Sequence, residues 1–361
     1  MTFWSENPAA PTLWTTLSPF MDRSPRFLRP SQPPTPPISW KGRGAIKRLF
    51  GTQSDLVAAF LTSHYRGSDW RLSNTDVWIR TYLRDPDIIA LGYFEESDAS
   101  GRLLGTIFAV PFLTTGSSNV LQTSNGGFVR SAVVIEGLCV HSDLRSHGLA
   151  GFLLSHIDSF VTRTKGSTAF FYSRELSTRP LMSTALCADM YAFKKCTATA
   201  TTSTNIRTMP WHDFERLWIS NAPRWSSTSS VPCIVSLVPS NLRNDLLVFI
   251  QNGLVIVVSN TQRVSQTQEP IYEVQWCGIL DRDGVLSPAT ETQDFKLCLD
   301  SVAAVLGRGI LFVCGALVGC NISTEWEGWT YGTSGAHALF IYNYMPPAFG
   351  TCRIHIIRSE L

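Results

Sequence analysis

The residues best suited to chemistry lie in a short apolar run that polar residues interrupt. Positions 133–141 read Val-Val-Ile-Glu-Gly-Leu-Cys-Val-His, and Ser-Asp-Leu-Arg-Ser-His-Gly-Leu-Ala follows at 142–150. The apolar, β-branched residues predict a strand that is buried on both faces. The apolar positions that follow at helical spacing are Leu149, Phe152, Leu153, Leu154 and Ile157. Backbone N–H groups at the start of this helix, with Gly148 and Ala150 in the loop, are suited to bind an anion.

The composition sets limits on the class of protein. The chain has 361 residues, of which 44% are apolar and 16% are charged, so it can form one large or two medium domains. Its net charge of +2 gives no electrostatic case for a nucleic-acid partner. The nine cysteines include no Cys-x-x-Cys pair, which argues against a disulfide framework or a zinc site. We therefore expect a reducing compartment, the cytoplasm, and no metal.

Two segments are relevant to targeting: the N-terminal residues and the apolar segment at 301–320. The first residues have no signal-peptide pattern, and position 2 is not the glycine that myristoylation requires. Residues 301–320 are almost long enough to span a membrane, but Arg308 lies in their middle between two glycines. We expect no transmembrane segment here, but a helix that ends at Gly307 and a buried strand that begins at Ile310.

Other patterns predict the elements around the central run. Residues 1–40 contain nine prolines and several large aromatics, which is typical of an extended arm. This arm is either a disordered tail or is laid over the body of the protein. Two helices are expected to begin at 52–55 and 73–76, and a hairpin at 88–110 precedes the central strand. The other expected elements are strands at 169–173, 248–258, 271–279 and 310–317 and a helix at 295–306.

Several short sequence motifs along the chain resemble those of the GNAT acyltransferases. In particular, they resemble motifs of one branch of that superfamily, the N-myristoyltransferase family. They are Phe3-Trp4-x-x-x-Pro8, Ser39-Trp40, Leu104-Gly105-x-Ile107, Leu138-Cys-Val-His141, Leu144-Arg-Ser146, Arg145-x-x-Gly148-x-Ala150, and the run from Gly332 to Tyr344. The resemblance implies an α/β GNAT fold of two pseudo-symmetric halves that form one saddle-shaped sheet with flanking helices. It also implies an arm (1–40) that contacts acyl-CoA, an acyl-CoA-binding half (41–204) and a peptide-binding half (205–361).

The resemblance further implies transfer of a fatty acyl group, with myristoyl as the expected chain, from acyl-CoA to an N-terminal glycine of a protein. Such a transfer needs stabilisation of an oxyanion, removal of a proton from the ammonium, and close positioning of the two reactants. By resemblance, the oxyanion donors are the backbone N–H groups of Gly137 and Leu138. The residues expected to bind the co-substrate acyl-CoA are Phe3, Trp4, Leu138, Cys139, Val140, Arg145, Ser146, His147, Gly148, Leu149 and Ala150. No permanently bound cofactor is expected.

The proton acceptor and the peptide site depart from the family pattern. In the family a C-terminal carboxylate takes the proton, but this chain runs two residues past the usual end. The carboxylate could come from Leu361 if the end curls back, or from Glu360, and the alternative is a frayed tail. Peptide contacts are expected at Tyr172, Ser334 and Gly335, where an acidic residue of the family is missing. A preference for a downstream lysine should therefore weaken.

Three alternatives remain open at this point. His147 and Gly148 replace two basic residues of the N-myristoyltransferase motif. This replacement favours a GNAT enzyme that uses acetyl-CoA or another short thioester. The missing family residues and the longer C-terminus would also suit an inactive binding protein. Cys139 and His141 could form a nucleophile pair, although a packed cysteine beside a surface histidine is the simpler interpretation. The remaining histidines, among them His64, are expected to stand alone, and the protein is expected to be a monomer.

Overall fold

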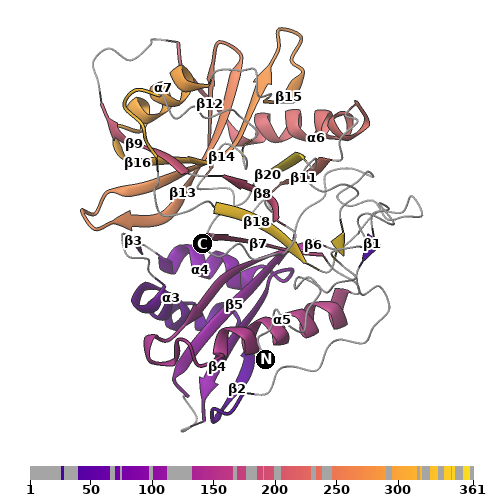
Figure 1. Ribbon diagram of the computed structural model, residues 1–361, viewed down its shortest axis with the longest axis vertical. Helices are drawn as coiled ribbons and strands as arrows, with labels where there is room; N and C mark the ends of the chain where they lie inside the picture. The colour runs from indigo at the N-terminus through magenta and orange to yellow at the C-terminus, as the bar shows by residue number, and fades with distance from the viewer. Residues whose placement is uncertain are drawn as a thin grey trace.

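The computed structural model contains two large β-sheets with helices packed between and around them (Figure 1). It describes residues 26–27, 40–65, 70–73, 75–96, 101–111, 132–165, 169–175, 185–189, 191–198, 205–228, 233–237, 246–289, 295–314, 318, 326–331, 337–342, 344–345 and 353–357.

The first sheet has seven strands in the order β2-β4-β5-β6-β7-β18-β8. Their bounds are Gly44–Arg48 (β2), Ile89–Glu95 (β4), Leu103–Pro111 (β5), Ala132–Val140 (β6), Ala169–Glu175 (β7), His337–Tyr342 (β18) and Ala185–Asp189 (β8). Nearly every residue of β4 and β5 is buried, as expected for strands covered on both faces. Among the described strands of this sheet, β6 and β7 form the one parallel pair, and helix α5 (Leu149–Lys165) lies between them in the chain.

The second sheet has nine strands, seven of them in the order β10-β12-β13-β14-β16-β9-β17, with β15 paired to β14 and β3 paired to β13. Their bounds are Arg207–Met209 (β10), Leu246–Gln251 (β12), Leu254–Ser265 (β13), Pro270–Leu280 (β14), Arg308–Cys314 (β16), Tyr191–Thr197 (β9), Thr330–Tyr331 (β17), Leu286–Pro288 (β15) and Trp70–Leu72 (β3). Two short pairs complete the strands: β1 (Arg26–Phe27) with β19 (Tyr344–Met345), and β11 (Cys233–Leu237) with β20 (Arg353–Ile357).

The same unit of structure occurs once in each sheet. In the first sheet β4, β5 and β6 pair antiparallel, and α5 leads to β7, which is parallel to β6. In the second, β12, β13 and β14 pair antiparallel, and α7 (Lys296–Leu306) precedes β16, which is parallel to β14. The third strand of each unit also carries a bulge soon after its parallel pairing ends. This repetition is the pseudo-symmetry that the fold class implied.

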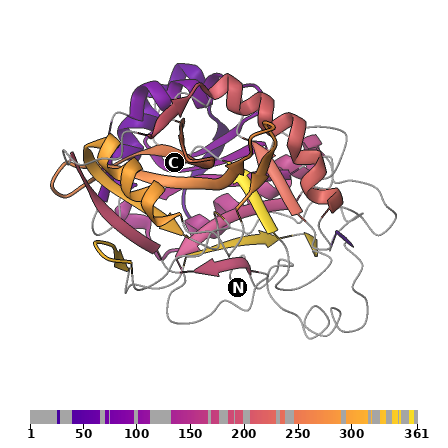
Figure 2. The ribbon, with the colours of Figure 1, turned by 90° about the horizontal axis from the view of Figure 1, so that it is seen from above.

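Three further helices pack on one face of both sheets. They are α3 (Ser54–His64), α4 (Thr75–Arg84) and α6 (Trp211–Thr228), which Figure 2 shows along one side of the molecule. One hydrophobic cluster joins Tyr82 of α4 and Phe108 of β5 to Trp218 of α6 and Trp276 of β14. The opposite face of the first sheet packs on α5 in a separate cluster. Because the first cluster spans both sheets, the two units share a core.

The predicted α/β fold class and most of its elements are confirmed, but the single saddle-shaped sheet is wrong for the described strands. Among the described strands, β8 pairs with β18, and β9, which begins two residues later, pairs with β16 and β17, so no described ladder joins the two sheets. The sheets also exchange strands across the expected boundary at residue 204. Strand β9 precedes that boundary yet lies in the second sheet, and β18 follows it yet lies in the first.

The apolar segment from residue 301 is a helix followed by a strand, as predicted. Helix α7 ends at Leu306, Gly307 has φ +68°, and β16 begins at Arg308. A positive φ is readily adopted by glycine and stops the helix. In the described part of the chain, no helix is both long and apolar enough to span a membrane.

Candidate active site

Strand β6 contains a bulge at the position where the sequence predicted oxyanion donors. Thr106 of β5 lies opposite Cys139 and Phe108 lies opposite Glu136, so Ile107 alone faces Gly137 and Leu138. Gly137 has φ +55°, a left-handed conformation that glycine adopts without the strain of a Cβ atom. The predicted bulge is therefore present, and its geometry explains why a glycine stands there.

A buried threonine fixes the orientation of the bulged peptide. The Thr106 hydroxyl, which is fully buried, donates a hydrogen bond of 2.9 Å to the carbonyl oxygen of Gly137. The carbonyl of Gly137 is thus directed toward β5. In a planar trans peptide the C=O and the following N–H point in opposite directions, so the N–H of Leu138 is directed away from β5.

On the side of β6 toward which this N–H points, strand β7 pairs with only part of the described strand. Strand β7 pairs with β6 only at Ala132, Val133 and Val134, and its later residues pair with β18. Among the described strands, none pairs with β6 on that side beyond Val134. The bulge therefore presents a backbone donor where an extended group could lie beside the strand.

The loop after β6 leads directly into helix α5. A 3₁₀ turn spans Ser142–Leu144, Ser146 has φ +66° and Gly148 has φ +95°, and α5 begins at Leu149. The first N–H groups of a helix have no partner within it, and left-handed residues near them form a concave arrangement of N–H groups. A Cβ atom on Gly148 would lie 3.9 Å from Cζ3 of Trp40, so conformation rather than space selects glycine. The loop has the geometry of an anion site.

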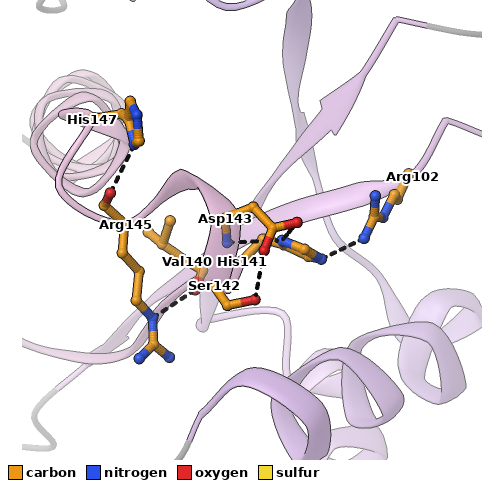
Figure 3. Close-up of polar contacts among 7 residues, drawn as sticks. All are labelled: Arg102, Val140, His141, Ser142, Asp143, Arg145 and His147. Carbon is orange, nitrogen blue, oxygen red and sulfur yellow. Dashed lines mark hydrogen bonds and ion pairs between the residues drawn. The ribbon is translucent and has the colours of Figure 1, made fainter.

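The side chains of this loop point in different directions. Arg145 donates from Nε to the carbonyl of Val140 at 3.5 Å and from Nη2 to the carbonyl of His64 at the end of α3. His147 Nδ1 lies 2.7 Å from the carbonyl oxygen of Arg145, as Figure 3 shows. The hydrogen bond from Arg145 to His64 therefore links the loop to α3. Ser146, His147 and Gly148 are exposed, whereas Leu149 is buried and Ala150 is half-buried.

His141 is buried, which corrects the expectation of a surface histidine. Its side chain lies between Arg102, which contacts Nε2, and the backbone N–H of Asp143, which donates to Nδ1 at 3.3 Å (Figure 3). Its ring lies 4.1 Å from that of His64, so His64 does not stand alone either. Burial lowers the pKa of His64, and the electrostatic influence of His141, Arg102 and Arg145 lowers it further. The folded chain brings these four residues together from separate elements, so their spacing in the sequence gave no sign of the cluster.

Cys139 is packed in the core, as the simpler interpretation held. It belongs to the cluster that contains Phe108 and Tyr82, and burial raises the pKa of its thiol to about 12. A thiol with such a pKa carries almost no thiolate at neutral pH. The residue is therefore not suited to act as a nucleophile.

One polar residue of β6 had not been expected to take part in the site. Glu136, immediately before the bulge, accepts a hydrogen bond of 2.9 Å at Oε2 from the hydroxyl of Tyr82. Tyr82 is fully buried on α4 and Glu136 is partly buried. A charged residue inside an otherwise apolar strand was the available signal in the sequence.

Several predicted site residues lie outside the described part of the chain: Phe3, Trp4, Ser334, Gly335 and Leu361. Tyr172 lies in β7, where its backbone is opposite that of Phe340 in β18. The described residues contain no group of three or more histidine, cysteine, aspartate or glutamate side chains that could hold a metal ion. The described site is therefore made of backbone donors, the α5 loop and the residues around Glu136.

Comparison with solved structures relates this fold to that of N-myristoyltransferase. A Saccharomyces cerevisiae N-myristoyltransferase with bound myristoyl-CoA superposes with a TM-score of 0.65 at 11% identity, covering 95% of this chain and 87% of that one. The same yeast protein with myristoyl-CoA and inhibitors gives 0.64 at 12% identity, with coverages of 95% and 89%. A third structure with myristoyl-CoA gives 0.61 at 12% identity, with coverages of 96% and 93%.

No protein-family model and no curated protein matches the sequence. The similarity therefore lies in the fold, over nearly the whole chain. The protein shares the fold of N-myristoyltransferase, as the sequence motifs indicated.

Proposed function

We propose that this protein is an acyltransferase that moves a fatty acyl group, myristoyl, from acyl-CoA to the N-terminal glycine of a protein. The observation that carries the proposal is the bulge at Gly137, which directs the N–H of Leu138 to the side of β6 where no described strand pairs beyond Val134. A thioester carbonyl placed there would gain a backbone hydrogen bond as it becomes an oxyanion. The similarity in fold to a protein that binds myristoyl-CoA supports the choice of co-substrate.

In this proposal acyl-CoA lies along the end of β6 and the start of α5. The main chain of Leu138, Cys139 and Val140 would pair with the extended arm of coenzyme A. The loop from Arg145 to Ala150 would hold the pyrophosphate through its N–H groups and the dipole of α5. Phe3 and Trp4 of the N-terminal arm would cover the ligand. These roles belong to the half of the chain at 41–204 with its arm at 1–40.

The acceptor peptide would bind from the other half, at 205–361. Tyr172, Ser334 and Gly335 are proposed to contact it, and the C-terminal carboxylate of Leu361 is one proposed acceptor of the ammonium proton. The amine attacks the thioester directly, and coenzyme A leaves. We propose that the protein acts as a monomer in the cytoplasm.

A second function is favoured by one feature of the loop. Gly148, which has φ +95°, occupies the position at which the myristoyltransferase motif has a basic residue. The general GNAT motif has glycine at this position. A transferase that uses acetyl-CoA or another short thioester would need no more than this loop and the bulge. A catalytically inactive binding protein is the third possibility, and turnover distinguishes it from the other two.

Intact-mass measurement of acyl transfer tests the proposal. The protein is incubated with equal amounts of myristoyl-CoA and acetyl-CoA and a peptide that begins with glycine and has serine at position 5. We expect the peptide to gain one myristoyl group. An acetyl gain would move the assignment to a short-chain transferase, and no gain from a protein that binds acyl-CoA would identify a binding protein.

A pair of glycine variants connects the activity to the bulge. Gly137→Ala places a Cβ atom on a residue with φ +55°, whereas Gly284→Ala does the same at φ +78° in a turn with open space around it. Both variants meet a similar backbone strain of about 1–2 kcal/mol. We expect only Gly137→Ala to lose most of the turnover.

A further inference from the structure

Glu136 is the only charged residue of strand β6, which otherwise reads Ala-Val-Val-Ile, then Gly-Leu-Cys-Val. Ile135 and Cys139 of the same strand are buried in hydrophobic clusters on its two faces, Ile135 in the α5 cluster and Cys139 in the cluster that includes Tyr82. Burying a carboxylate among apolar residues is costly unless it is hydrogen-bonded. Its presence directly before the bulge therefore needs an explanation.

The carboxylate is held by a rigid partner. The Tyr82 hydroxyl donates to Oε2 at 2.9 Å, and the Tyr82 ring packs 4.0 Å from that of Trp78 and 6.2 Å from that of Phe108. Tyr82 is fully buried, so it has little freedom to move. A hydrogen bond to an ionised carboxylate is strong and directional, and this one fixes Glu136 on the α4 side of the sheet.

The position of Glu136 suits a reaction at the bulge. It precedes Leu138 by two residues, a distance of about 7 Å along a strand. The Glu136 carboxylate lies on the face of the sheet that α4 covers, where the Tyr82 hydroxyl donates to it. Glu136 and Leu138 are both partly exposed, so the one carboxylate of β6 is close to the proposed reaction centre.

We propose that Glu136 is the group that accepts the proton from the acceptor's ammonium, in place of a C-terminal carboxylate. This inference rests on the proposed function. The carboxylate takes one proton from the ammonium, and the neutral amine forms a C–N bond to the thioester carbonyl carbon. The C–S bond then breaks, and the coenzyme A sulfur takes the second proton from the amine nitrogen. The proton on Glu136 returns to solvent, so no oxidant or other reactant is needed.

The ionisable groups near the Glu136 carboxylate affect how the pH dependence of acyl transfer is interpreted. Tyr82 is the titratable group of α4 that contacts it, and Cys139 lies further along the same face of β6. His64, at the end of α3, is influenced by His141, Arg102, Arg145 and Asp143 at the C-terminal end of β6.

The test is the pH dependence of acyl transfer by wild type and Glu136→Gln. The glutamine keeps the size of the side chain and an oxygen that can accept from Tyr82, so the fold is retained. Acyl-CoA binding, measured by calorimetry, checks this. We expect kcat to fall by about 10²–10⁴-fold, as for loss of a general base. The acid limb of kcat/KM should move toward pH 8, where an α-amino group loses its proton unaided.

The chain offers a matched control in its second sheet. Glu273 of β14 accepts a hydrogen bond of 3.3 Å from the Tyr191 hydroxyl and is buried, so it repeats the Tyr–Glu pair on the corresponding strand. Glu273→Gln should leave the acid limb in place. Tyr82→Phe keeps the Glu136 carboxylate but removes its donor, and the limb should move to higher pH because the ionised form loses a stabilising hydrogen bond.

The possible failures are distinguishable. If wild type transfers no acyl group to any acceptor, the proposed function fails and this inference fails with it. If wild type is active and Glu136→Gln keeps kcat within a factor of about three with an unchanged acid limb, Glu136 is not the base while the transferase assignment stands. Loss of turnover on removing Glu360 and Leu361, with Glu136→Gln fully active, would assign the proton to the C-terminal carboxylate.

Discussion

Replacing Thr106 with valine removes a single hydroxyl from the bulge. Valine has nearly the same shape, so the packing around β5 is kept, but the Gly137 carbonyl loses the 2.9 Å hydrogen bond that directs it toward β5. An unsatisfied buried carbonyl costs about 1–3 kcal/mol, and we expect the free energy of unfolding to fall by that amount. The N–H of Leu138 is then held less firmly in the orientation that an oxyanion requires.

The effect on catalysis can be bounded from known oxyanion donors. Complete removal of one such donor lowers kcat by about 10²–10³-fold. Thr106→Val leaves the N–H in place and only loosens it, so a fall in kcat of about tenfold to a hundredfold is expected. The KM for acyl-CoA should change little, because the loop at the start of α5 is untouched.

Steady-state kinetics with urea unfolding separates this effect from simple loss of stability. Thr106→Ser keeps the hydroxyl and removes a buried methyl group, which costs about 0.8 kcal/mol in transfer free energy. It should therefore be destabilised yet keep most of its kcat. Equal kcat values for the serine and valine variants, or a loss in KM alone, would refute the argument that Thr106 orients the bulge.

Three further predictions concern the loop, the second sheet and the histidine cluster. Gly148→Ala should weaken acyl-CoA binding measured by calorimetry, because φ +95° strains any residue with a Cβ atom. Burial raises the pKa of Asp300, but hydrogen bonds led by those from Lys194 at 2.7 Å and Lys296 at 2.8 Å outweigh it and the net shift is downward. Asp300→Asn should therefore lower the free energy of unfolding at pH 7 by about 2–3 kcal/mol, and the difference should shrink as the pH falls below 3.8, the ordinary pKa. The lowered pKa of His64, caused first by burial, means that the unfolded chain binds more protons below pH 6.5. Wild type should lose more stability than His64→Gln as the pH falls from 7 to about 5, and equal slopes in urea unfolding would contradict this.

Much of the first unit of structure could be predicted from local patterns. The apolar run at 133–140, the breaking residues after it and the helical spacing from Leu149 correspond to β6, the loop and α5. Gly137 as a bulge and Gly307 as a helix end were also predictable, because glycine at such places signals a positive φ. These features depend on neighbours within a few residues along the chain.

The sequence was least informative where contacts between distant segments decide the result. Periodicity does not show that β9 joins the second sheet and β18 the first, since strands of similar pattern can pair with either. The burial of His141 depends on Arg102 and His64, which lie 39 and 77 positions away in the sequence. Such proximity is a property of the folded chain.

The sequence by itself determined the strand, the glycine of its bulge, the loop and the helix start, and these are the features on which the proposed ligand depends. These depend on backbone conformation, which side chains specify locally. Only the tertiary structure decided that Thr106 would orient the Gly137 carbonyl and that Tyr82 would hold Glu136 beside the bulge. A hydrogen bond between residues 31 or 54 positions apart exists only after the sheet and α4 have packed together. The residues proposed to carry out the reaction can therefore be identified in the sequence, but their arrangement depends on the packing of the core that the two sheets share.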